Sequence, residues 1–345
     1  MASEKDVLKA LSSVIDPDLG KDLVSLNMIE NLKVEGKNVS FTVVLTTPAC
    51  PLRSFFEKQC RQVVLEQTDA EYVDVKVSSR VVETKKVMID KNQFKHVIAV
   101  GSGKGGVGKS TVAVAIAESL AGDGAKVGLL DSDIYGPNIP RMLGLDGPEP
   151  SPEGQKIKPA EKDGIKVVSI GFFVEEGQPL IWRGPMLHSA IQQFLTDFDW
   201  GELDYLIIDM PPGTGDVQLS LSQTLPISGA VVVTTPQQVA VDDAARAIAM
   251  FKKMSIPILG VVENMAYLEM PDGSHLAVFG EGGGEHLALH EGVPFLGSVP
   301  LDPEIGKGGD IGSPLVSQAE ERASAQSLRK IARAVAAESS KAALG

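Results

Sequence analysis

The feature that most constrains this chain is a glycine-rich segment at residues 103–111, which reads Gly-Lys-Gly-Gly-Val-Gly-Lys-Ser-Thr. An apolar run at 97–100 precedes it, and a helical pattern at 109–121 follows it. Glycines let backbone N–H groups turn inward, and the N-terminus of the following helix adds a partial positive charge. A strand, a loop of this spacing and a helix together are typical of a phosphate-binding P-loop.

The P-loop predicts a site for ATP and Mg²⁺ in which two residues have defined roles. Lys109 is expected to reach the β- and γ-phosphates, and the Ser110 hydroxyl to ligate Mg²⁺. The residues expected to surround the phosphates are Gly103, Lys104, Gly105, Gly106, Val107, Gly108, Lys109, Ser110 and Thr111.

The chain after residue 96 alternates apolar runs with helical patterns, the runs falling at 127–130, 167–170, 206–208, 230–234 and 258–262. Strands that alternate with helices predict an α/β fold, a doubly wound and mostly parallel sheet. Its ligands should bind at the carboxyl ends of the strands. We therefore predict a P-loop ATPase domain over residues 96–345.

The first 82 residues show a different pattern, that of a small α+β domain. The sequence predicts a helix over 3–15 with Ser3 as its N-cap, because apolar residues recur on one face. Two strands at 28–35 and 38–46, a helix from Pro51 to about Gln67 and a strand at 72–80 complete the unit. The mostly polar residues 83–95 are interpreted as a linker.

Carboxylates follow two of the predicted strands where they would meet the phosphates. Asp131 and Asp133 come after the run at 127–130, and Asp209 comes after the run at 206–208. Asp209 is expected to hold Mg²⁺ through water. A stiff loop at 210–216 follows, and its Gly213 N–H is a candidate sensor of the γ-phosphate. Either carboxylate group alone is equally a turn former, but their order after the P-loop favours a nucleotide site.

Composition narrows the function classes. The formal net charge is −13, and the excess of acidic residues lies after residue 82, where 33 carboxylates face 22 basic residues. A protein surface with this excess of negative charge repels the phosphate backbone of nucleic acids, so no nucleic-acid partner is expected. No apolar run reaches the roughly 18–20 residues of a membrane span, no signal-peptide core is present, and two cysteines do not make a secreted disulfide framework. We expect a cytoplasmic protein without membrane association.

Lys104, inside the loop, makes the segment similar to the deviant P-loop of the MinD/ParA, nitrogenase iron-protein and arsenite-pump ATPases. In that class the extra lysine reaches across a homodimer to the partner's nucleotide. The resemblance therefore implies a homodimer with Lys104 and Lys109 in catalytic roles. It further implies that Asp133 orients the attacking water and that Asp131 supports the Mg²⁺ shell. Asn264, which follows the run at 258–262, would bind the adenine edge, although an asparagine there is also a common turn former.

The order of the motifs resembles the Mrp/ApbC family of iron–sulfur cluster ATPases. The segments that carry the resemblance are the P-loop, Asp-Ser-Asp-Ile-Tyr-Gly-Pro-Asn-Ile-Pro at 131–140, Trp-Arg-Gly-Pro-Met at 182–186, Asp-Met-Pro-Pro-Gly-Thr-Gly-Asp at 209–216, Thr-Pro-Gln-Gln at 235–238, Glu-Asn-Met at 263–265 and Phe-Gly at 279–280. The first domain, with Asp-Pro-Asp-Leu-Gly at 16–20 and Thr-Thr-Pro-Ala-Cys-Pro at 46–51, is similar to SufT/PaaD-type assembly factors. The resemblance implies a slow ATPase that delivers iron–sulfur clusters, with apoproteins and assembly factors as partners.

One departure concerns the cluster itself. Many members of that family carry a Cys-x-x-Cys after the Glu-Asn-Met segment, where this chain has Met270 and Gly273. Neither residue replaces the thiolates that clusters require. Cys50, at the predicted start of a helix, remains a candidate ligand of a 4Fe–4S cluster, a reactive thiol or a buried apolar residue. Cys60 is expected in the core, too far along the helix to share a cluster with Cys50.

Three alternatives to a cluster carrier follow from these residues. A spatial-organisation ATPase of the MinD/ParA type would associate with membrane or DNA, which the acidic charge disfavours. An electron-donating reductase would need cysteines in the ATPase domain, where there are none. A scaffold would keep the ATPase and bind no cluster. The histidine pair His286 and His290 has metal-binding spacing but is interpreted as part of a surface helix.

Overall fold

The computed structural model describes residues 3–17, 21–45, 53–79, 93–149, 151–152, 155–173, 184–215, 218–219, 221–222, 225, 227–313, 316 and 321–344, with the backbone alone for 184–188. The contacts divide the chain into two compact units, over residues 1–82 and 83–343. The expected linker overlaps a strand at its end, because strand β4 already begins at Phe94; residues 83–92 lie outside the described chain.

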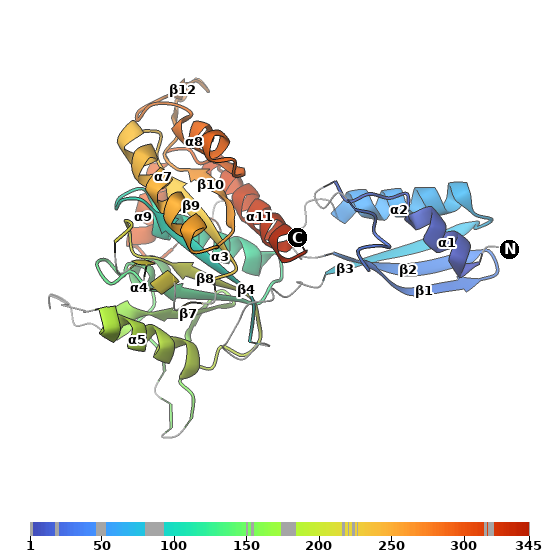
Figure 1. Ribbon diagram of the computed structural model, residues 1–345, viewed down its shortest axis with the longest axis horizontal. Coiled ribbons are helices and arrows are strands. Elements are labelled where there is room, and N and C mark those ends of the chain that lie inside the picture. Colours follow the sequence, from blue (N-terminus) through green and yellow to red (C-terminus); the bar gives the residue numbers. More distant parts are fainter. Residues whose placement is uncertain are drawn as a thin grey trace. The chain divides into compact units, whose positions relative to one another are not determined.

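The small unit is a three-stranded sheet with two helices on one face (Figure 1). Its elements are α1 (Glu4–Leu11), β1 (Ile29–Glu35), β2 (Asn38–Leu45), α2 (Arg53–Gln67) and β3 (Tyr72–Ser79). β1 and β2 pair antiparallel, and β2 and β3 pair parallel. Apolar residues that alternate along β2 and β3 face the helices, so Phe41, Phe56, Cys60 and Val75 share one buried core.

Helix α1 begins as the sequence predicts and ends earlier. The Ser3 hydroxyl accepts a hydrogen bond from the Asp6 N–H at 3.2 Å, and the Asp6 carboxylate accepts one from the Ser3 N–H at 3.2 Å, which is a capping box. The helix ends at Leu11, four residues before the predicted end. The Ser12 and Ser13 hydroxyls bond backbone carbonyls there, a local competition that favours helix ends.

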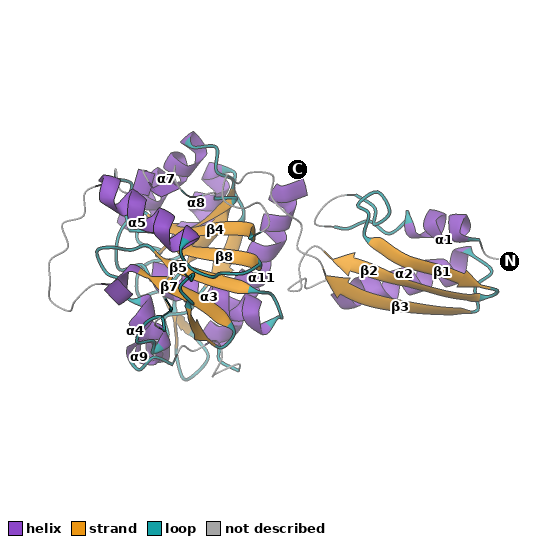
Figure 2. Ribbon diagram, turned by 90° about the horizontal axis from the view of Figure 1, so that it is seen from below, coloured by secondary structure: helices purple, strands orange, loops and turns teal. Residues whose placement is uncertain are grey.

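The large unit is built on an eight-stranded sheet with helices on both faces (Figure 2). Its sheet contains β4 (Phe94–Ser102), β5 (Val127–Asp131), β6 (Ala160–Lys162), β7 (Ile165–Ser169), β8 (Leu203–Asp209), β9 (Gly229–Thr234), β10 (Ile258–Glu263) and β13 (Phe295–Ser298). The order is β13-β10-β9-β4-β8-β5-β7-β6, and the described pairs are parallel except for β6 against β7. This confirms the predicted doubly wound α/β fold.

Helices and short elements connect the strands of the large unit. They are α3 (Lys109–Gly122), α4 (Ile139–Leu143), the 3₁₀ turn Ile170–Phe173, α5 (Gly184–Thr196), α7 (Gln238–Lys253), the hairpin β11 (Leu268–Glu269) and β12 (His275–Leu276), α8 (Gly283–Glu291), α9 (Pro303–Asp310) and α11 (Ala323–Leu344). Within the described chain, no helix is both long enough and apolar enough to cross a membrane.

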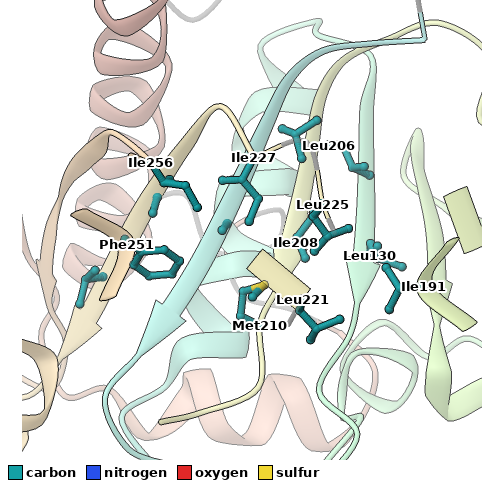
Figure 3. Packing of buried hydrophobic residues seen from close by; sticks show 14 of the residues in the cluster. Leu130, Ile191, Leu206, Ile208, Met210, Leu221, Leu225, Ile227, Phe251 and Ile256 are labelled. Atoms are coloured by element: carbon teal, nitrogen blue, oxygen red, sulfur yellow. The ribbon is translucent and has the colours of Figure 1, made fainter. Parts of the chain in front are cut away.

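Apolar side chains from the strands and from the helices on one face form a continuous core (Figure 3). Leu206 and Ile208 of β8 lie there with Ile191 of α5, and Phe251 of α7 packs beside Ile256. The parallel strands are buried on both faces, which explains their nearly continuous apolar sequences. The packing holds β4 between β8 and β9, so the loop after β4 opens at the carboxyl edge of the sheet.

Candidate functional site

The glycine loop after β4 depends on glycine at specific positions. Gly106 and Gly108 have φ of +81° and +83°, a left-handed conformation that other residues adopt only with strain. A Cβ atom on Gly108 would lie 2.1 Å from Nδ2 of Asn264, and one on Gly103 would lie 2.1 Å from the Asp243 carbonyl carbon. The loop therefore passes directly against the backbone of α7 at Asp243 and Ala244, within the first half of that helix.

Lys109, the first residue of α3, is buried with 6% of its surface exposed. Its ammonium lies 2.6 Å from Asp209 Oδ1 and 3.3 Å from Asp133 Oδ2. Burial alone would lower the pKa of Lys109, but attraction to Asp209 and then to Asp133 outweighs it and raises the pKa. The lysine is therefore held in its charged form at the N-terminus of α3.

Two carboxylates at neighbouring strand ends lie behind this lysine. Asp131 and Asp209 are partners in the β5–β8 register and are fully buried. Burial, followed by the charge of Asp209, raises the pKa of Asp131 to about 8, although the Ser169 hydroxyl donates to it at 2.8 Å. Burial also raises the pKa of Asp209, against the opposing effect of Lys109. The Ser110 hydroxyl donates to Asp209 Oδ2 at 2.6 Å, so the predicted group comes together as one cluster.

Three predicted residues have contacts that the sequence did not indicate. Lys104 is half-buried, with its ammonium 3.4 Å from Oε1 of Gln237 in the same chain. The Asn264 amide donates to the Val107 carbonyl at 2.9 Å and so braces the glycine loop. The Gly213 N–H, expected to sense a γ-phosphate, donates instead to the Ser102 carbonyl at 2.9 Å. The segment from Met210 to Gly213 runs beside the end of β4, where the Met210 N–H also donates to the Val100 carbonyl at 3.0 Å.

Lys109, Ser110 and Asp133 line a cavity of ≈ 370 Å³. One wall is the P-loop, with Lys104, Lys109, Ser110 and Thr111. The opposite walls are α4 and α9, which sequence reasoning missed; they supply Asn138, Arg141, Met142, Ile305, Gly306, Gly309 and Asp310. The only sequence signals for these walls were a Pro-Arg-Met-Leu-Gly run at 140–144 and the glycine-rich helix at 303–310.

Comparison with protein families agrees with this geometry. A family model described as NUBPL iron-transfer P-loop NTPase matches residues 93–336. The chain belongs to this family. A second model, described as iron-sulfur cluster assembly protein, matches residues 4–78 and so covers most of the small unit. The resemblance seen in the motifs is thereby confirmed.

Relatives of this NTPase extend over its whole length. The iron-sulfur cluster carrier protein of Synechocystis sp. is 50% identical over all of both chains, and that of Deinococcus radiodurans is 51% identical over 96% of this chain and 94% of its own. The chloroplastic Fe-S cluster assembly factor HCF101 of Arabidopsis thaliana is 44% identical over 91% of this chain and 60% of its own.

Solved structures show the same fold for the large unit. A nucleotide-binding protein of Archaeoglobus fulgidus, in complex with ADP, is 41% identical with a TM-score of 0.57 over 64% of this chain and 87% of its own. The cell division ATPase MinD of Pyrococcus furiosus is 25% identical with a TM-score of 0.53 over 70% of this chain and 98% of its own.

The residues considered for an iron–sulfur cluster lie in different surroundings, an exposed hairpin and a buried core. Met270 and Gly273 lie in the β11–β12 hairpin, with Met270 37% exposed and Gly273 in a left-handed turn. Cys60 is fully buried in the small unit, and burial raises the pKa of its thiol to about 12. Cys50 lies outside the described residues.

The histidine pair is on a surface helix, as the sequence indicated. His286 and His290 are both exposed on α8. Within the described ranges, no three histidine, cysteine, aspartate or glutamate residues are grouped so that they could hold one metal ion.

Proposed function

We propose that this NTPase binds and slowly hydrolyses Mg·ATP and that it carries iron–sulfur clusters to apoproteins in the cytoplasm. The observation that carries the nucleotide part is the buried ion pair of Lys109 with Asp209, 2.6 Å apart at the end of the P-loop. Buried ionisable groups whose pKa values are shifted by specific charge partners gather at functional sites, and here Lys109, Asp131 and Asp209 form such a group at the end of the P-loop. The cargo part rests on full-length relatives named iron-sulfur cluster carrier protein.

The residues at the strand ends fit a magnesium ion. Ser110, Asp209 and, behind them, Asp131 present oxygen atoms, the donors that this hard cation prefers. When bound, Mg²⁺ would neutralise phosphate charge. Asp133, 3.3 Å from the Lys109 ammonium, is proposed to orient the attacking water and accept its proton, and Lys109 to stabilise charge on the transferred phosphoryl group.

Lys104 is proposed to act across a homodimer. Its ammonium rests on Gln237 of its own chain at 3.4 Å, a long hydrogen bond that is easily exchanged. Approach of a second copy would let Lys104 exchange Gln237 for the nucleotide phosphates of that copy. Asn264, which supports the loop through the Val107 carbonyl, is proposed to offer its remaining polar atoms to the adenine edge.

The two parts of the chain are proposed to have separate tasks. The boundaries we propose are an assembly-type domain over 1–82, a connecting segment over 83–95 and the ATPase domain over 96–345. The family models, which match 4–78 and 93–336, support this division. Iron–sulfur apoproteins and assembly factors are the proposed partners.

The nucleotide part is tested by substituting the two lysines of the loop separately. Lys109→Ala is expected to abolish measurable ATP binding, and Lys104→Ala to preserve binding but lower turnover about 100-fold. The measurements are equilibrium binding of Mg·ATP and phosphate release. Lys253→Ala, an exposed lysine at the end of α7, is the matched control. Unchanged binding and turnover in Lys109→Ala would show that the site is assigned wrongly.

The cargo part is tested by anaerobic reconstitution with iron and sulfide. Because the Cys60 thiol is buried and protonated, Cys50 is the proposed ligand for a 4Fe–4S cluster, completed by a second subunit, a client or a small thiol. Cluster absorbance should appear in wild type and in the control Cys60→Ala, and disappear in Cys50→Ala. No cluster in any of the three would contradict carriage and favour a scaffold that recruits other assembly proteins.

A further inference from the structure

The nucleotide cavity contains a cation that neither the motifs nor the proposed mechanism uses. Three basic side chains line it: Lys104, Lys109 and Arg141. Lys109 is paired with two carboxylates and Lys104 contacts Gln237. Arg141, on α4, is exposed and forms no ion pair with any residue in the described part of the chain. It faces the cavity from the wall opposite the P-loop.

The charges of the cavity explain why an arginine without an ion pair among the described residues is useful there. The ammonium of Lys109 is already offset by Asp209 and Asp133, so the P-loop wall offers a phosphate chain little net positive charge. A triphosphate carries one more anionic group than a diphosphate. A guanidinium can meet such a group with two parallel N–H donors, a geometry that matches phosphate oxygens.

The backbone that carries Arg141 is held in place on two sides. The Ile139 N–H donates to Asp131 Oδ2 at 3.3 Å, which ties the start of α4 to the carboxylate cluster. Its end, Gly144, crosses Gly312 just after α9, so closely that a Cβ on Gly312 would lie 2.6 Å from the Gly144 Cα. The arginine is thus a flexible side chain on a braced support, able to reach a ligand while its backbone stays fixed.

We propose that Arg141 binds the γ-phosphate and makes this site prefer ATP to ADP. The inference rests on the proposed nucleotide function and adds to it the residue that recognises the triphosphate. Lys109 contacts the phosphates from the P-loop in either nucleotide. Arg141 reaches from α4 to the terminal phosphate, which only ATP possesses.

The experiment compares Mg·ATP and Mg·ADP binding to the full chain by isothermal titration calorimetry. Arg141→Ala should weaken ATP binding by about 10- to 100-fold, the usual loss for a charge-assisted hydrogen bond, and ADP binding by less than about 3-fold. Arg141→Lys keeps the charge and loses the two parallel N–H donors. Its affinity for ATP should lie between those of wild type and Arg141→Ala, and its affinity for ADP should stay close to that of wild type. Arg246→Ala, an exposed arginine on α7, is the matched control and should bind both nucleotides like wild type.

The remaining outcomes decide against the inference. Equal losses for ATP and ADP, or no loss for either, in Arg141→Ala would overturn the role of Arg141 while the nucleotide site stands. If wild type binds neither nucleotide, the proposed function and this inference both fail. Should Arg141→Ala not fold, Arg141→Lys and Arg141→Gln provide the same comparison, and an unchanged ATP preference in both would overturn the proposal.

Discussion

Lys109 in the large unit and Cys60 in the small unit are both buried titratable groups, with opposite surroundings. Lys109 has two carboxylates within 3.3 Å, and its pKa is raised, so it stays charged. Cys60 lies among apolar side chains, and burial raises its pKa to about 12, so it stays neutral. Burial with partners preserves a reactive charge, whereas burial without partners removes it.

The contrast explains why the nucleotide site is easier to assign than the cargo site. A buried charge requires a fixed set of neighbours, and these are the residues that recur as motifs around the P-loop. A core thiol requires only apolar contacts of suitable size, which any of several residues provide. If the nucleotide site depends on a fixed set of neighbours, a change of one P-loop glycine should be poorly tolerated.

Gly103→Ala should have the largest effect on stability. The added Cβ would lie 2.1–2.5 Å from backbone atoms of Asp243 and Ala244, which cannot move without shifting α7. We expect a loss of about 3 kcal/mol or more in the free energy of unfolding, because overpacking against backbone has no flexible neighbour to yield. Urea denaturation measures this, and ATP binding should be lost in parallel.

The matched control for Gly103→Ala is Gly105→Ala in the same loop. A Cβ there meets nothing within 4 Å, and Gly105 does not have a positive φ. Its unfolding midpoint should stay close to that of wild type. Equal midpoints for Gly103→Ala and wild type would show that the close crossing of the loop and α7 is not a requirement of the fold.

Cys60→Ser should have the second-largest effect, and it tests the apolar side of the comparison. A hydroxyl in place of the thiol puts a polar group in the core, which costs about 1–3 kcal/mol of unfolding free energy. Cys60→Ala keeps the site apolar and should cost about 1 kcal/mol. Thermal or urea unfolding of both variants decides, and a serine variant as stable as wild type would contradict the apolar environment.

The same thiol has a defined pH dependence. Its pKa is 9.0 in the unfolded chain and about 12 in the folded one, so the folded state keeps a proton that the unfolded state releases. The stabilisation is therefore complete below pH 9 and is lost as the pH rises from 9 to 12. In a Cys50→Ser background, a disulfide reagent at pH 8 should react with Cys60 only on unfolding. Rapid labelling of the folded protein would contradict its burial.

Much of the fold could be predicted from the sequence because local patterns and tertiary contacts agree. The predicted runs at 127–130 and 206–208 are apolar throughout, as buried parallel strands must be, and both form strands, although β8 begins three residues earlier, at Leu203. The helix predicted over 3–15 was too long at its end, since Val14 and Ile15 continue the apolar period beyond Leu11 while local hydrogen bonds of Ser12 and Ser13 end the helix.

Part of the candidate site could likewise be predicted from the sequence, and part could not. The P-loop and the aspartates at 131, 133 and 209 come together because they follow adjacent parallel strands, which the alternating pattern already implies. Arg141 and helix α9 could not be predicted, since their approach depends on the crossing of Gly144 and Gly312, two glycines 168 positions apart in sequence. Nothing in the local sequence of either segment indicates that contact.

Asp302→Asn should have the smallest effect on the free energy of unfolding. Asp302 has charged and polar partners, as Lys109 does, but its ion pair with Arg322 is partly exposed to solvent. It caps α9 through the Glu304 N–H at 3.0 Å and accepts hydrogen bonds from Arg322 at 2.7 Å and from the Ser324 hydroxyl at 2.6 Å. Burial alone would raise its pKa, but Arg322 and the other donors together lower it to about 2. We expect Asn to reduce the unfolding free energy by about 1 kcal/mol at pH 7, since the pair is partly exposed to solvent.

The pH dependence of Asp302 should have the opposite sign to that of Cys60. A depressed pKa means that the folded state releases a proton that the unfolded state keeps, so the stabilisation is complete above about pH 4 and is lost as the pH falls toward 2. Urea unfolding at pH 7 and pH 3 should therefore differ less in Asp302→Asn than in wild type. Glu281→Gln, an exposed carboxylate outside α9, is the control and should leave the difference unchanged. An equal difference in Asp302→Asn and wild type would contradict the lowered pKa of Asp302 and the stabilisation that its ionised carboxylate gains from Arg322 and Ser324.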